Sequence, residues 1–157
     1  MIIKSIIDED FINYKKASMV LLMPYCSFKC EKECEGVHCH NKELFSKPDR
    51  DMPVIDIIKR YNDNDITKAV IFSGMEPLDS FDDVLAFIFC FRQSCDDDII
   101  IYTGYREDEV SDKVEKLSAY KNIIVKFGRY RTGQEKHFDD ILGVYLASNN
   151  QYAKIIS

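Results

Sequence analysis

Hydrophobic and polar residues follow one another along this chain in blocks that predict strands and helices in turn. Short continuous apolar runs, typical of strands buried on both faces of a sheet, occur at 19–23, 69–72, 99–102 and 123–127. Apolar residues recur at helical spacing in the segments 54–61, 81–91 and 108–119. This order of strands and helices predicts parallel βαβ units with right-handed crossovers, and so an α/β fold.

The segments that follow the apolar runs are where a site is expected. Further strands are predicted at 142–146 and 152–156, and the irregular stretch 128–141 is predicted to be a loop or lid. In parallel α/β folds, functional residues collect at the carboxyl ends of the strands. The loops expected to meet there contain the cysteine-rich segment, Ser73–Glu76, Thr103–Tyr105 and Gly128–Arg129.

The length of the chain limits the architecture. A closed barrel of eight βα units takes ~250 residues, whereas this chain has 157. We therefore expect an incomplete βα barrel with a mostly parallel sheet, formed by a single domain that spans residues 1–157. No linker or internal repeat divides the sequence.

Composition and charge exclude several classes of protein. With 46% hydrophobic residues the chain can form a core without disulfides. The apolar start is followed by Asp8, Glu9 and Asp10, so no signal peptide is expected. The longest apolar run, near 87–91, is far short of the ~20 residues that span a bilayer. The net charge of −6 disfavours nucleic acid as a partner. A cytoplasmic protein is expected.

Four of the six cysteines lie in the loop that follows the first apolar run, namely Cys26, Cys30, Cys34 and Cys39. In a reducing compartment, clustered thiolates more often hold a metal than pair as disulfides. Thiolate ligands suit both a tetrahedral zinc site and an iron–sulfur cluster, and the cysteines alone do not separate the two. Three thiolates would leave one iron of a cubane cluster open to a cofactor, whereas four would close the site.

Several motifs resemble those of radical S-adenosylmethionine enzymes. Cys26-Ser27-Phe28-Lys29-Cys30, ending in Cys39-His40-Asn41, is similar to their cluster loop. Ser73-Gly74-Met75-Glu76-Pro77-Leu78 resembles their Gly-Gly-Glu-Pro segment. Tyr102-Thr103-Gly104-Tyr105 and Ala147-Ser148-Asn149-Asn150-Gln151 are similar to the smallest branch, the activating proteins of anaerobic ribonucleoside-triphosphate reductase.

The resemblance implies a 4Fe-4S cluster held by Cys26, Cys30 and Cys39, with S-adenosylmethionine on the open iron. Eight residues separate Cys30 from Cys39, where the family has two, and Cys34 lies inside this insertion. Cys39 is favoured because it precedes His40-Asn41, and the alternative set with Cys34 in its place keeps a more compact loop. The residues implied to bind the cofactor are His38, Asn41, Ser73, Gly74, Met75, Glu76 and Lys126.

The resemblance also implies roles within this set. Gly74 and Glu76 are expected to face the methionine amine, His38 to lie beside the adenine, and Lys126 to contact a carboxylate or hydroxyl. Met75 replaces a glycine of the family, at a place where glycine can be needed for positive φ or close approach. As a loop carboxylate at a strand end, Glu76 is expected to contribute little to the core.

The implied activity is reductive cleavage of S-adenosylmethionine to a 5′-deoxyadenosyl radical, which generates a glycyl radical on the reductase. The implied partners are the glycyl radical subunit of anaerobic ribonucleoside-triphosphate reductase and an electron donor such as flavodoxin or ferredoxin. Two alternatives stay open. One is the same chemistry on another glycyl radical enzyme or a small molecule, and the other is a zinc-stabilised binding module without catalysis.

Overall fold

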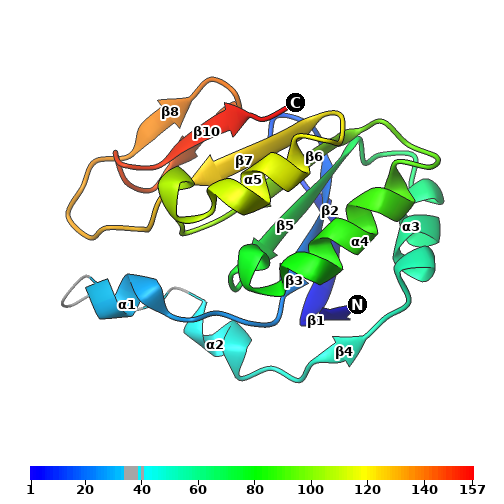
Figure 1. Cartoon of the computed structure of the whole chain (residues 1–157), viewed down its shortest axis with the longest axis horizontal. Coiled ribbons are helices and arrows are strands. Elements are labelled where there is room, and N and C mark those ends of the chain that lie inside the picture. The colour runs from blue at the N-terminus through cyan, green and yellow to red at the C-terminus, as the bar shows by residue number, and fades with distance from the viewer. Residues whose placement is uncertain (34–38, 40) are drawn as a thin grey trace.

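A six-stranded sheet in the order β10-β7-β6-β5-β3-β2 forms the centre of the molecule (Figure 1). The computed structural model describes residues 1–33, 39 and 41–157. The four inner strands run parallel to one another; they are β3 (Ser18–Met23), β5 (Ala69–Gly74), β6 (Asp98–Tyr102) and β7 (Ile123–Phe127). They coincide with the four apolar runs, so the α/β fold with a mostly parallel sheet is confirmed.

Antiparallel strands form both edges of this sheet. β2 (Ser5–Asp10) pairs with β3, and β10 (Tyr152–Ile155) pairs with β7. The strand expected at 152–156 therefore forms, although it runs against its neighbour. No strand was predicted at β2, whose second half is acidic. In the part of the chain that the structure describes, the sheet is open and does not close into a barrel.

Three helices cover one face of the sheet (Figure 1). They are α3 (Val54–Asn62), α4 (Phe81–Phe91) and α5 (Ser111–Leu117), close to the predicted segments. Short 3-10 turns precede two of them: η1 (Pro77–Ser80) leads into α4, and η2 (Glu107–Glu109) shortens the helix predicted at 108–119. None of the helices described is both long and apolar enough to cross a membrane.

The opposite face of the sheet is covered by loops and short strands. β8 (His137–Asp139) and β9 (Val144–Leu146) form a two-stranded ribbon, so the predicted lid at 128–141 contains a strand. β1 (Ile2–Ile3) pairs with β4 (Arg50–Asp51) on the helical side instead, where Ile3 packs in the same cluster as Phe87 of α4. The cysteine loop, residues 26–41, contains α1 (Lys29–Glu33), and α2 (Lys42–Phe45) follows it.

Alternate residues of the inner strands belong to two hydrophobic clusters, one on each face of the sheet. Val70 and Phe72 pack with the helices, whereas Ile71, on the same strand, packs with Tyr14 and Leu142 on the other face. Burial on both faces explains why these strands are continuously apolar in the sequence. The core thereby fixes the carboxyl ends of the inner strands, where the candidate site lies.

The aromatic core under α4 provides a test of the fold. Phe87 is fully buried, with ring centroids 5.3 Å from Phe72 and 5.5 Å from Phe91. We expect Phe87→Ala to lower the free energy of unfolding by about 3–5 kcal/mol, because it leaves a cavity in a packed core. Urea unfolding of the reduced protein, followed by circular dichroism, measures this loss.

Phe89 on the same helix is the matched control. Its side chain is 57% exposed, so Phe89→Ala should change the free energy of unfolding by about 0.5 kcal/mol or less. Equal losses in the two variants would contradict the packing of α4 described above.

Candidate functional site

The loops that follow β3, β5, β6 and β7 meet at one edge of the sheet, which we call the carboxyl rim. Backbone and side-chain hydrogen bonds link them in series. The amide of Glu76 donates to the carbonyl of Tyr25 (2.7 Å), and the amide of Gly104 donates to the Glu76 carboxylate (2.8 Å). The amide of Gly128 donates to the carbonyl of Tyr105 (3.0 Å). The predicted convergence of these four loops is therefore confirmed.

The Glu76 side chain is buried at the centre of this rim. Its Oε1 accepts hydrogen bonds from the Leu78 amide (3.0 Å) and the Thr103 hydroxyl (2.7 Å), while Oε2 accepts from Gly104. Burial raises the pKa of Glu76 to about 7, although these donors favour the charged form. The prediction that Glu76 contributes little to the core is wrong, since its carboxylate joins the loops after β5 and β6.

The loop after β5 also explains the unusual Met75. Gly74 has φ +86°, and a Cβ on it would lie 3.0 Å from both Leu22 Cα and Leu44 Cδ2. The positive φ and the close approach therefore fall on Gly74. Met75 is buried and does not have a positive φ, so a side chain is tolerated there. Ser73, the first residue of this motif, is half-buried and lies one residue before the end of β5.

Asn41 ties the end of the cysteine loop to the same motif. Its Nδ2 donates to the carbonyl of Gly74 over 2.5 Å. The amide of Cys39 donates to Glu31 Oε1 on α1 (2.9 Å). Just beyond, the buried Lys4 ammonium donates to the carbonyls of Phe45 (2.9 Å) and Lys47 (2.7 Å) around the end of α2. The chain that leaves the cysteine loop is thus fixed to the rim.

Asp79 and Tyr105 hold the beginning of the cysteine loop. Asp79 Oδ2 accepts from the Ser27 amide (2.7 Å), and its Oδ1 accepts from the Tyr105 hydroxyl (2.6 Å). Sequence reasoning did not identify Asp79, because one acidic residue near a turn is not distinctive by itself. Its role depends on a residue 26 positions away.

Cys26, Cys30 and Cys39 are free, half-buried thiols. Burial raises the pKa of Cys26 to about 11 and also raises that of Cys30. Cys34, His38 and His40 lie outside the described residues. The choice between Cys34 and Cys39 as the third ligand, and the adenine contact of His38, therefore stay predictions.

A cavity of about 380 Å³ opens beside two of these thiols. Its lining includes Cys30, Cys39, Asn41 and Lys126. Lys126 is buried, and its ammonium donates to the carbonyl of Gly128 (3.0 Å). Burial lowers the pKa of Lys126 to about 8, while the nearby Glu76 opposes this shift. The cavity therefore brings together thiols and a buried amine that is largely charged at neutral pH.

A larger cavity, of about 750 Å³, has Gly128 and Arg129 in its lining. Its lining includes Glu33 and Arg106, which form an ion pair with each other at 3.9 Å. None of the described cysteines lines it. We therefore place the candidate site in the smaller cavity, where the chemistry-bearing side chains meet.

The described thiols are a donor set that an iron–sulfur cluster can use. Among the described residues, no three His, Cys, Asp or Glu side chains are grouped closely enough to hold one ion. In a cubane cluster each thiolate binds a different iron atom, so its ligands surround a larger body. Free thiols from one loop, with two of them facing a cavity, fit such a cluster with an accessible iron.

The fold and this site define an α/β protein with a candidate metal centre at its carboxyl rim. Residues 17–152 match the family model described as the 4Fe-4S single cluster domain, and the chain belongs to that family. The matched range covers every loop of the carboxyl rim. A comparison with curated proteins found no match. Family membership favours iron–sulfur over the zinc alternative.

The buried Glu76 carboxylate can be tested directly. We expect Glu76→Ala to lower the free energy of unfolding by about 2 kcal/mol or more, because three buried donors lose their acceptor. Urea unfolding of the cluster-free protein measures this loss. Glu115→Ala is the control, because Glu115 is an exposed carboxylate on α5. A loss no larger than that of the control would contradict a structural role for Glu76.

Proposed function

We propose that this protein is a radical S-adenosylmethionine enzyme that activates an anaerobic ribonucleoside-triphosphate reductase. The observation that carries this proposal is the cavity in which Cys30 and Cys39 lie beside the buried cation of Lys126. Membership of a 4Fe-4S family supports the cluster, and the motifs of the rim support the cofactor. In this reading the open sheet corresponds to an incomplete βα barrel within a single domain.

The proposal gives a role to each of the site residues predicted from the sequence. Cys26, Cys30 and Cys39 hold the cluster, and Lys126 binds the carboxylate of S-adenosylmethionine. A bound carboxylate compensates part of the cost of burying the lysine charge. The backbone of Ser73, Gly74 and Met75 faces the methionine amine, and Glu76 and Asn41 hold this loop in place. His38 contacts the adenine.

A 4Fe-4S cluster held by Cys26, Cys30 and Cys39 would supply one electron for reductive cleavage of a C–S bond of S-adenosylmethionine. The products would be methionine and a 5′-deoxyadenosyl radical, which would take a hydrogen atom from a glycine Cα of the reductase. The protein itself binds and orients the cofactor, and it excludes water from the cavity. Ile12, Tyr102 and Leu146 are among the apolar residues that line the cavity. The electron donor is a protein such as flavodoxin or ferredoxin, and the reaction takes place in the cytoplasm.

Anaerobic reconstitution with iron and sulfide tests the proposal. We expect a brown protein that forms 5′-deoxyadenosine from S-adenosylmethionine under dithionite, and a glycyl radical signal on added reductase by electron paramagnetic resonance. A colourless protein with one zinc per chain would contradict the proposed function. Cofactor cleavage without a radical on the reductase would instead favour another glycyl radical enzyme or a small molecule as substrate.

Alanine substitution tests the ligand assignment. We expect Cys39→Ala to lose both the cluster and cofactor cleavage, because a cubane with two thiolates is poorly held, whereas Cys34→Ala keeps both. Iron content and 5′-deoxyadenosine yield are the measurements. Cys90→Ala, at an exposed position on α4, is the control and should match the unmodified protein. The reverse pattern would identify Cys34 as the third ligand.

Lys126 makes cofactor affinity depend on pH. Its pKa of about 8 in the folded protein means that the ammonium loses its proton as pH rises through 8. The attraction for a carboxylate is therefore present below this pH and lost above it. We expect the KM for S-adenosylmethionine to rise between pH 7 and 9, by about tenfold. In Lys126→Met the KM should be high throughout, with iron content unchanged. An identical pH profile in this variant would exclude the role.

A further inference from the structure

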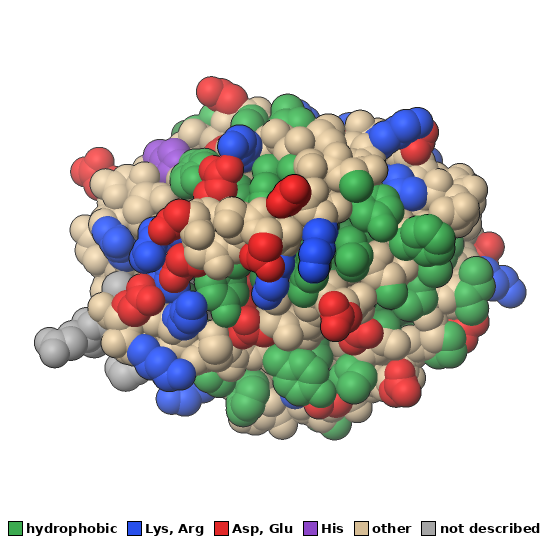
Figure 2. All heavy atoms as spheres, in the orientation of Figure 1, with side chains coloured by type: hydrophobic (Ala, Val, Ile, Leu, Met, Phe, Trp, Pro, Cys, Tyr) green, Lys and Arg blue, Asp and Glu red, His purple; other side chains and the backbone are tan. Residues whose placement is uncertain are grey.

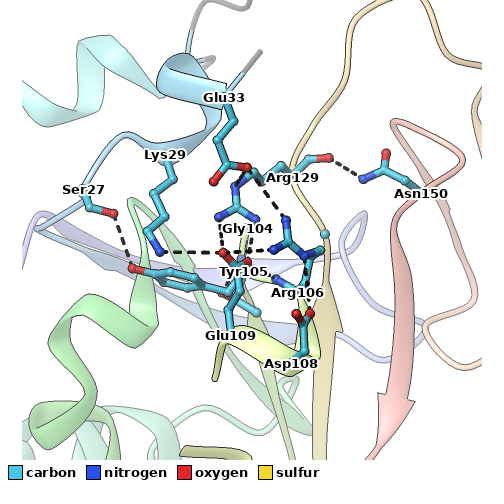
Figure 3. Close-up of polar contacts among 12 residues, drawn as sticks. Ser27, Lys29, Glu33, Gly104, Tyr105, Arg106, Asp108, Glu109, Arg129 and Asn150 are labelled. Carbon is cyan, nitrogen blue, oxygen red and sulfur yellow. Dashed lines mark hydrogen bonds and ion pairs between the residues drawn. The ribbon is translucent and has the colours of Figure 1, made fainter. Parts of the chain in front are cut away.

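The helix that carries Cys30 cannot hold its own position. α1 has 5 residues and none of them is buried. An isolated helix of this length is unstable in water, because few hydrogen bonds offset the cost of ordering the backbone. Contacts with the rest of the rim must therefore fix α1. Figure 3 shows these contacts, which are mainly ion pairs of Lys29 and Glu33 with side chains from the loops after β6 and β7.

Arg129 is the buried partner in this group. Its side chain is 5% exposed, and its two terminal nitrogens donate to the two oxygens of Glu109 over 2.7 and 2.8 Å. Its Nε lies 3.1 Å from Glu33 Oε2, in an ion pair that is not aligned as a hydrogen bond. The guanidinium thus bridges a carboxylate on η2 and one on α1, and planar bidentate pairing suits arginine in particular.

The backbone of Arg129 is fixed from the opposite side. Asn150 Nδ2 donates to the carbonyl of Arg129 (2.8 Å), and Gln151 Nε2 donates to the carbonyl of Gly128 (3.2 Å). Gly128 has φ +101°, and a Cβ there would lie 2.8 Å from the Asn150 carbonyl oxygen. The turn at 147–151, noted in the sequence for its resemblance, therefore serves to hold the loop of Arg129.

Arg129 also lies close to the thiol of Cys30. Both pack over Gly104, since a Cβ on this glycine would lie 3.4 Å from Cys30 Sγ and 3.8 Å from Arg129 Cγ. Cys30 and the stem of Arg129 thus share one contact surface. Glu76 Oε2 lies over the same glycine, 3.5 Å from that Cβ position, so Cys30, Glu76 and Arg129 meet there.

We propose that Arg129 is a positioning residue for the cluster, because by joining Glu33 to Glu109 it holds α1 and Cys30 against the carboxyl rim. This inference rests on the proposed ligation of the cluster by Cys30. Arg129 does not touch the cofactor in this account and acts through the helix. Positively and negatively charged side chains intermingle on the left of Figure 2. Arg129 differs from these surface charges because its side chain is buried.

Arg106 is the natural comparison. It also reaches Glu33 (3.9 Å) and Glu109 (3.6 Å), but its side chain is 54% exposed. Exposed ion pairs contribute little because water screens them and the side chains lose rotamer freedom. A buried, hydrogen-bonded arginine costs far more to remove because its partner is left unpaired. Arg106→Gln and Arg129→Gln therefore remove similar partners with different expected effects.

Limited trypsin digestion of the cluster-free protein measures how firmly α1 is held. The readout is the rate of cleavage after Lys29, relative to cleavage after Lys59 in α3. We expect Arg129→Gln to raise the rate about tenfold, because Glu109 loses its hydrogen-bonded partner. Glu33→Gln should raise it about threefold, because the Glu33 side chain is 44% exposed, and Arg106→Gln should leave it nearly unchanged. The double variant Glu33→Gln/Arg129→Gln should be no faster than Arg129→Gln alone, because that single variant has already lost the Glu33–Arg129 pair.

Glu33→Gln leaves the Arg129–Glu109 pair intact. This variant therefore still tests the positioning role of Arg129 if Arg129→Gln does not fold. An unchanged rate in Glu33→Gln, or an equal rise in Arg106→Gln, would overturn the inference. In the reconstituted protein, iron loss to a ferrous chelator should be faster in Glu33→Gln than in Arg106→Gln, and equal rates would overturn the link to the cluster. Failure to assemble any cluster would refute the proposed function, while the digestion result would still report on α1.

Discussion

The buried carboxylate of Glu76 is the contact on which the geometry of the carboxyl rim depends. Its oxygens accept from the backbone of the loop after β5 and from Thr103 and Gly104 after β6. Its own amide donates to Tyr25, directly before the first cysteine. One residue therefore sets the relative position of three loops, two through its carboxylate and the third through its amide. Away from water such bonds are strong, and an unpaired member is costly, so the arrangement is rigid.

Glu76 and Lys126 show how two buried charges can serve different purposes. Burial raises the pKa of the carboxyl to about 7 and lowers that of the ammonium to about 8, because water no longer stabilises either charged form. The carboxylate already accepts from three protein donors. The ammonium has three N–H donors and one of them faces the carbonyl of Gly128. Glu76 is thus used by the fold, whereas two N–H donors of Lys126 have no hydrogen-bond acceptor among the described residues.

The inner strands could be predicted because burial on both faces leaves a continuous apolar run, such as that of β7. β2 could not, since half of this edge strand is polar and its pairing is set by β3. The direction of β10 was not predictable either, because strand pairing is decided by tertiary contacts. At α5, the reciprocal bonds between Arg106 and Glu109 stabilise a 3-10 turn and delay the helix to Ser111.

For the candidate site, the sequence predicted which loops meet, because carboxyl ends of parallel strands share one edge. It did not predict how deeply each side chain lies. Glu76 has the polarity of a surface residue, yet three donors make its burial tolerable. The importance of Asp79 and Arg129 comes from partners far away in the chain, and a single sequence does not contain that information.

The anchors of the cysteine loop explain how a long insertion is tolerated between Cys30 and Cys39. Ser27 and Glu33 are held by Asp79 and Arg129 on one side, and Asn41 is held by Gly74 on the other. All of these contacts lie outside residues 34–38. Extra residues between fixed ends add little to the free energy of closing a loop, about 0.6 kcal/mol for each doubling of its length. The length of the insertion can therefore vary while the flanking thiols keep their place at the rim.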